Sequence, residues 1–167
     1  MQLNGMLHTF PKELKILLAV FIIVLSVGFY TGLLFVGETS SANPNGIEEQ
    51  YLGNEDNGEA TVMKFKKNER QMLTLVHGHI LSMSIIFFLV GLILSTTKLS
   101  RRIKMILIIE PFISVLLTFG GIYFLWKGML WMKYIVVISG SLMALAYTVS
   151  VLIILYQLLV SRKVNLS

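Results

Sequence analysis

The chain contains four long apolar runs, Ile16–Val36, Gln71–Thr97, Met105–Trp126 and Tyr134–Val160, separated by polar segments. Each run can form a helix across a bilayer core of about 30 Å, which needs about 20 residues. The pattern predicts an all-α integral membrane protein, an antiparallel four-helix bundle with one extramembrane loop. In a single membrane domain over residues 1–167, the spans are expected at about 12–36, 71–97, 103–126 and 132–160, with the outer loop at 37–70.

Composition supports this prediction. Hydrophobic residues make up 55% of the 167 residues, and the mean hydropathy of +0.76 is far above that of a soluble domain. The absence of cysteine excludes disulfides, thiol redox chemistry and thiolate metal sites. The basic residues behind the net charge of +5 cluster at the ends of the runs. They therefore indicate topology and contact with anionic lipid, and we expect no nucleic-acid partner.

The distribution of lysine and arginine predicts the orientation of the chain. The compact Lys98–Lys104 connection is rich in basic residues, and such connections resist translocation. We therefore expect a multi-pass membrane protein with both termini in the cytoplasm. The Glu38–Arg70 segment and the Lys127–Lys133 turn then face outward. Trp126 and Trp131, near that boundary, are expected to be interfacial anchors.

The outer loop is polar and rich in turn-forming residues in its first half. Its second half, Val62–Lys67, alternates apolar and basic residues, which suggests a short interfacial strand or helix. Two interpretations remain open. The loop is a tether whose lysines touch lipid headgroups, or it is a docking surface for a partner. The apolar anchors of such a surface would be Ile47, Tyr51, Leu52, Met63 and Phe65.

The second run carries His77 and His79, with Met83 four residues after the latter. Ionisable residues inside a span are candidates for function. Residues two apart on a helix point about 200° apart, so the two histidines can bind one metal ion only if Gly78 marks a distortion of the helix. His79 and Met83 share a face and are ligand types for haem iron or copper. The alternatives are methionine packing and histidine hydrogen bonds to a neighbouring helix or to water.

Counting inward from the outer ends of the four runs predicts one layer of small and polar residues. It contains Tyr30, Thr31, His77, Gly120, Gly121, Ser139 and Gly140. Glycines let a flat ligand approach the backbone. The layer therefore predicts either a pocket for haem b, a quinone or a lipid headgroup, or tight packing with hydrogen bonds between Tyr30, His77 and Ser139. In a single chain the only other histidine, His8, is expected at the opposite membrane side, so a second haem ligand would come from methionine or from a homodimer.

Glu110 is the one formally charged residue within the four runs, and Pro111 follows it. Proline removes a backbone donor and loosens the helix. One interpretation is snorkelling of the carboxylate toward Arg101, Arg102 or Lys104. The other is a proton relay or ion site, since desolvation favours a neutral carboxyl group.

Several short motifs resemble a group of small bacterial four-span membrane proteins without an established activity. The motifs are Tyr51-Leu52-Gly53, Met63-Lys64-Phe65, Val76-His77-Gly78-His79, Glu110-Pro111-Phe112 and Phe119-Gly120-Gly121-Ile122. The resemblance covers most of the chain after about Thr31. It implies a bacterial inner-membrane location.

Three functional hypotheses follow. The first is a non-enzymatic membrane subunit that associates with a membrane-protein partner or with itself. The second is a small haem-binding or quinone-interacting redox protein using His77, His79, Met83, Gly120, Gly121 and Tyr30. The third is a proton or ion pathway through Glu110. The first is favoured because polar residues are scarce through the middle of the spans, where a conducting path usually shows them.

Overall fold

The computed structural model describes residues 4–160 except 56, 59 and 61, without the side chain of Val160. Its elements are η1 (Met6–Thr9), α1 (Lys12–Ser40), α2 (Pro44–Leu52), α3 (Glu69–Ser95), α4 (Arg101–Trp126) and α5 (Met132–Val160). The described residues contain no strand. The four long helices are long and apolar enough to cross a membrane. The predicted all-α bundle is therefore confirmed.

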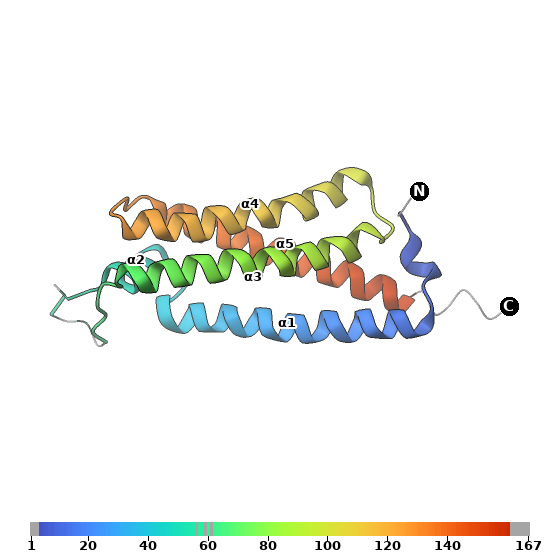
Figure 1. Ribbon diagram of the computed structural model, residues 1–167, viewed down its shortest axis with the longest axis horizontal. Coiled ribbons are helices and arrows are strands. Elements are labelled where there is room, and N and C mark those ends of the chain that lie inside the picture. The colour runs from blue at the N-terminus through green and yellow to red at the C-terminus, as the bar shows by residue number, and fades with distance from the viewer. Residues whose placement is uncertain (1–3, 56, 59, 61, 161–167) are drawn as a thin grey trace.

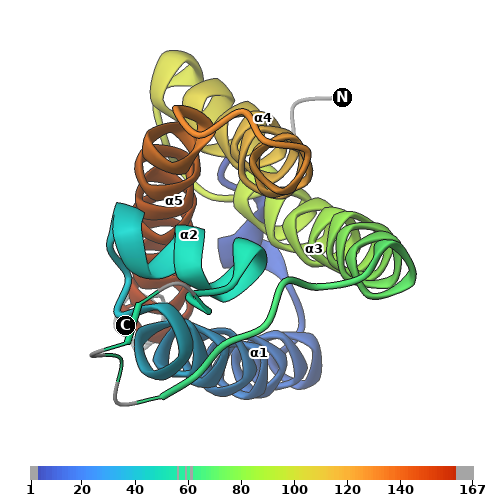
Figure 2. The same cartoon turned by 90° about the vertical axis from the view of Figure 1, so that its left-hand side faces the viewer.

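The four long helices run antiparallel in chain order (Figure 1). The α1–α2 connection, α2 and the α4–α5 turn lie at one end, which we call the cap end. η1 and the α3–α4 turn lie at the other, which we call the N-terminal end. The closest packing is between α4 and α5, and α3 packs mainly on α4. In the most apolar window of α1, only 11% of the residues are buried, against 39% in α4 and α5, so α1 lies at the periphery (Figure 2).

The helix ends differ from the predicted spans where polar residues extend or stop a helix. α1 continues beyond residue 36 to Ser40, and it ends where Ser41 and Ala42 adopt positive φ angles of 53° and 48°. α3 begins at a capping box in which Asn68 and Gln71 satisfy each other's backbone N–H groups. At its other end, the Thr97 hydroxyl donates to the Leu94 carbonyl at 2.6 Å.

The cap end is a folded layer. α2, a helix that the sequence analysis did not predict, crosses the end of α1 (Figure 2). The approach is so close that a Cβ atom at Gly46 would lie 1.9 Å from the Ser40 carbonyl oxygen, so only glycine fits there. Lys133 Nζ on α5 lies 2.6 Å from Glu48 Oε2 on α2, and Lys64 Nζ donates to the Thr39 carbonyl. These contacts hold α2 and the following loop against the spans.

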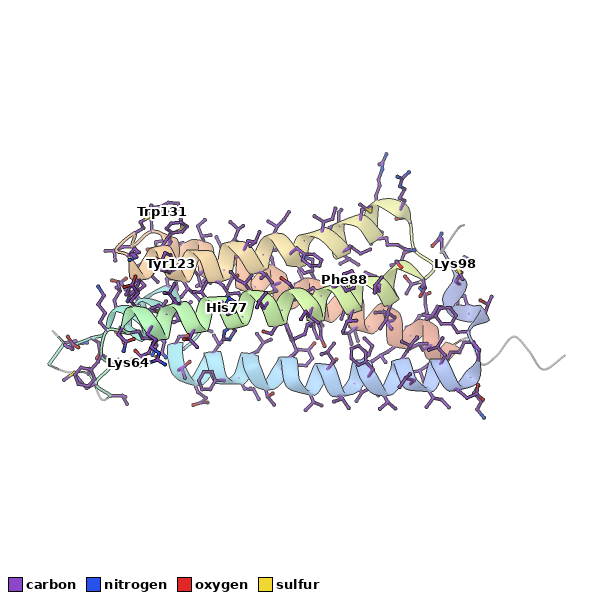
Figure 3. All side chains as sticks on the ribbon, in the orientation of Figure 1. Lys64, His77, Phe88, Lys98, Tyr123 and Trp131 are labelled. Carbon is purple, nitrogen blue, oxygen red and sulfur yellow. The ribbon has the colours of Figure 1, made fainter. Side chains whose placement is uncertain are left out.

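Three expectations for this end are wrong. Ile47 belongs to α2 and its side chain is buried, so it does not belong to an exposed docking surface. Trp126 is also buried, and its indole N–H donates to the Lys67 carbonyl at 2.7 Å, whereas Trp131 is 55% exposed (Figure 3). Trp126 therefore stabilises the cap end, and its ring is not a lipid-facing anchor. The Val62–Lys67 segment forms neither a strand nor a helix, and its Phe65 is exposed.

The N-terminal end is closed by the residues before α1. Leu7 is fully buried, and its backbone N–H donates to the Thr96 carbonyl. The Gly5 N–H donates to the Thr97 carbonyl at 3.3 Å. Lys104 Nζ, on the first turn of α4, donates to the carbonyls of Ser95 and Thr97 and to the side chain of Asn4. The ammonium group thereby neutralises the carbonyl end of α3 and ties the α3–α4 turn to the N-terminal segment.

Candidate functional site

His79 lies in the cap-end half of α3, and its side chain is exposed. Its ring packs against Phe119 of α4, with 4.8 Å between the centroids. Nδ1 is 2.8 Å from the carbonyl oxygen of Leu75, one turn earlier. A carbonyl oxygen can only accept, so Nδ1 carries a proton, and in the neutral form of the ring Nε2 is the acceptor. Neutral His79 thus presents a lone pair at the surface of the bundle.

The surface around His79 is an open groove on α3. Its lining consists of Asn68, Arg70, Gln71, Thr74, Leu75, Gly78, His79 and Ser82. Six of these residues, Gln71 to Ser82, recur at spacings of three and four and form one stripe that we call the α3 face. A Cβ atom placed on Gly78 would meet no atom within 4 Å. The α3 face is therefore uncovered and permits close approach of another molecule.

The predicted cofactor layer does not assemble around a common cavity. His77 is exposed on α3 (Figure 3), and Met83 is part-buried against the core. Gly120 is half-buried, and Gly121 faces Val136 of α5. Tyr30 hydrogen-bonds to Thr148 at 2.8 Å. Within the described part of the chain, no three His, Asp or Glu side chains come together as metal ligands.

The expected position of Tyr30 is wrong for a physical reason. The apolar run ends at Val36, but α1 continues to Ser40 in the cap end, so counting from residue 36 placed Tyr30 too near the boundary. The side chain belongs to a cluster between α1 and α5. Phe29 stacks on Tyr147 with 3.9 Å between ring centroids, and the Tyr147 hydroxyl lies 3.2 Å from Ser26 Oγ. Ser139, also expected to bond to Tyr30, pairs with Thr118 instead.

Each hydroxyl group of this cluster donates a hydrogen bond to an acceptor within the chain. The Thr148 hydroxyl donates to the Ala144 carbonyl, so it accepts from Tyr30. Likewise, Ser26 donates to the Ile22 carbonyl and accepts from Tyr147. These bonds attach the peripheral α1 to α5, since a hydroxyl in an apolar setting needs a partner. Thr148 and Tyr147 are not foreseeable from local sequence, because their partners are over 100 residues away.

A second group of polar residues lies along α4 toward its contact with α5, with Ser114, Thr118 and Ser139 buried and Glu110 part-buried. Glu110, Ser114 and Thr118 are spaced by four residues on α4, and Ser139 lies opposite on α5. We call these four residues the polar seam. The Ser114 hydroxyl donates to Glu110 Oε1, and Thr118 Oγ1 lies 2.7 Å from Ser139 Oγ. Glu110 Oε2 is buried and has no hydrogen-bond partner among the described residues.

The polar seam corrects the expected environment of Glu110. The carboxyl group does not snorkel toward Arg101, Arg102 or Lys104, because it bonds to Ser114, one turn farther from the N-terminal end. Lys104 is held by the carbonyls of α3. Ser114 and Thr118 were not predicted as neighbours of Glu110, although successive spacings of four from Glu110 place all three on one helical face.

Comparison with known proteins identifies the class of the chain. Neither a curated protein nor a solved structure matches it. One family model, described as a transmembrane helical domain and named Aq_1264_TM, matches residues 41–165. The match covers α2 to α5 and leaves out α1, the helix with the least buried surface. With its four spanning helices, the chain is a multi-pass integral membrane protein and belongs to the Aq_1264_TM transmembrane helical domain family.

Proposed function

We propose that this protein is a non-enzymatic subunit of a bacterial inner-membrane complex, and that it docks to another membrane protein through the α3 face. The observation that carries the proposal is an uncovered polar surface on a spanning helix. Thr74, His79 and Ser82 are all exposed, although they lie about 8 to 20 Å inside α3 by the helical rise.

Lipid is an unfavourable neighbour for this surface. Hydrocarbon offers no hydrogen-bond partners, so the acceptor at His79 Nε2 favours contact with a donor from another protein. Small residues at Thr74, Gly78 and Ser82 would allow a second helix to approach closely. The partner expected here is a membrane helix that carries a hydroxyl, amide or indole N–H at the level of His79.

The orientation with both termini in the cytoplasm is part of the proposal. Exposed basic residues at the N-terminal end support this orientation. The most important are Lys98 in the α3–α4 turn and Arg101 and Arg102 at the start of α4. At the cap end, two of the basic side chains have acidic partners, since Lys127 pairs with Glu69 and Lys133 with Glu48.

The haem and quinone hypotheses receive less support from the geometry. Their residues are divided between the α3 face, the opposite flank of α3, the α4–α5 contact and the α1–α5 cluster. The groove at His79 is lined by α3 residues and its N-cap Asn68, and so it does not clasp a flat ligand between helices. An absorption spectrum of the purified protein after haem supply tests this alternative, and a Soret band lost in His79→Ala would favour it over the docking proposal.

The docking proposal is tested by filling the α3 face. Gly78→Leu adds a side chain where the chain itself has open space, so the bundle should remain folded while close helix association is blocked. We expect co-purification with the membrane partner in mild detergent to fall at least tenfold. Leu73→Ala is the matched control, because Leu73 is exposed on the opposite flank of the same helix. Equal recovery of partner with both variants would contradict the proposal.

A further inference from the structure

Glu110 is the one carboxyl group among the described residues that lies more than two turns inside a spanning helix. It follows the start of α4 by nine residues, roughly 14 Å by the helical rise. The docking proposal does not use it, because it lies in the seam between α4 and α5 and not on the α3 face. A group of this kind, deep in a span, is a candidate for function in its own right.

No cation faces this carboxyl group among the described residues. In the half of α3 that packs beside it, from Met83 to Ser95, no side chain is titratable. On α5, the buried Tyr147 directs its hydroxyl to Ser26. On α4 itself, Arg101 and Arg102 are exposed at the helix start. Lys104 is engaged with three oxygens of the N-terminal end.

The hydrogen bonds of Glu110 distinguish its two oxygens. Oε1 accepts from Ser114, whereas Oε2 is buried without a donor. An ionised carboxylate accepts at both oxygens and needs several donors, and Pro111 next to it has no backbone N–H to offer. Burying an ionised group with one donor is far less favourable than burying the neutral acid.

We propose that Glu110 is a proton-binding site, with the proton on Oε2 and the hydroxyl of Ser114 donating to Oε1. Binding joins the carboxylate to one proton taken from water and gives the neutral acid. Release of that proton leaves a carboxylate that requires water or a cation in the polar seam.

The test is an infrared spectrum of the protein in lipid vesicles across pH, with Glu110→Gln as the reference. The expected result is a carbonyl-stretch band of a protonated acid that is present in the wild type at neutral pH and lost in E110Q. Ser114→Ala should shift this band. Thr118→Val is the matched control, since it removes a buried hydroxyl one turn beyond Ser114 that does not bond to Glu110, and it should leave the band in place. A band that survives in E110Q, or a wild type that shows none at neutral pH, overturns the proposal.

A second measurement needs no variant and serves if E110Q does not form the bundle. Hydrophobic dicyclohexylcarbodiimide adds to protonated carboxyl groups, and peptide mapping of the wild type locates the adduct. Labelling of Glu110 that declines as pH rises is the expected outcome. Two outcomes contradict a buried proton-binding site. One is that a water-soluble carbodiimide labels Glu110 to the same extent, and the other is that Glu110 is not labelled at any pH.

Discussion

Gly121 of α4 lies directly against Val136 of α5, and a Cβ atom built on the glycine would be 2.9 Å from Val136 Cγ2. A Cβ atom there would be closer than van der Waals packing allows, so the Val136 side chain fits against α4 because position 121 is a glycine. This contact lies one helical turn from the Thr118–Ser139 pair, and together these contacts set the separation of the two helices that pack most extensively.

Gly121→Ala should therefore destabilise the bundle, by about 1 to 3 kcal/mol, because the new methyl group forces Val136 to move. The measurement is reversible unfolding in detergent followed by helical circular dichroism. Gly78→Ala is the control, since open space surrounds Gly78, and it should change stability by less than about 1 kcal/mol. Adding Val136→Ala to Gly121→Ala should restore part of the loss. If G121A and G78A behave alike, the close contact does not set the packing.

Trp126→Phe should loosen the cap end. It removes the indole donor to the Lys67 carbonyl and leaves that carbonyl unpaired, which costs about 1 kcal/mol. Limited proteolysis in the segment between α2 and α3 should become faster, and the unfolding free energy should fall. Trp131→Phe, at an exposed position, should leave both unchanged. Equal effects of the two substitutions would show that the indole bond contributes nothing specific.

The stability of the cap end should depend on pH in the alkaline range through Tyr51. Burial in α2 raises the pKa of Tyr51 to about 12, from an ordinary value of 10.0. Above pH 10 the unfolded chain loses a proton that the folded chain retains, so stability present below pH 10 is lost as pH rises toward 12. The loss is roughly 2 kcal/mol. Tyr51→Phe should remove this part of the pH profile, whereas Tyr156→Phe, at an exposed position, should retain it.

The orientation can be read from two single cysteines, since the chain has none of its own. Gly58 and Ser100 are exposed at opposite ends of the bundle. Cysteine at position 58 should react with an impermeant thiol reagent on intact cells, and cysteine at position 100 should react only after the membrane is opened. Labelling at position 100 alone in intact cells would reverse the proposed topology.

The parts of the fold that sequence analysis predicted are those set by local composition. Long apolar runs demand helices in a membrane whatever surrounds them, so the four spans were foreseeable from α1, α3, α4 and α5 separately. α2 was not, because a polar helix of nine residues is stable only through tertiary contacts such as Glu48 with Lys133. The candidate site shows the same division. Glu110 is visible as a charge in an apolar run, but its hydrogen bond to Ser114 depends on a rotamer that composition does not determine.

The closure of the N-terminal end has a consequence for how the chain is made. The amide oxygen of Asn4 accepts a bond from the backbone of Leu99, 95 residues later in the sequence. The contacts of Asn4 and Leu7 therefore form only after α3 and the following turn have been synthesised. Synthesis of α1 therefore precedes the docking of the segment that leads into it, and this segment closes the N-terminal end only when the α3–α4 turn is in place.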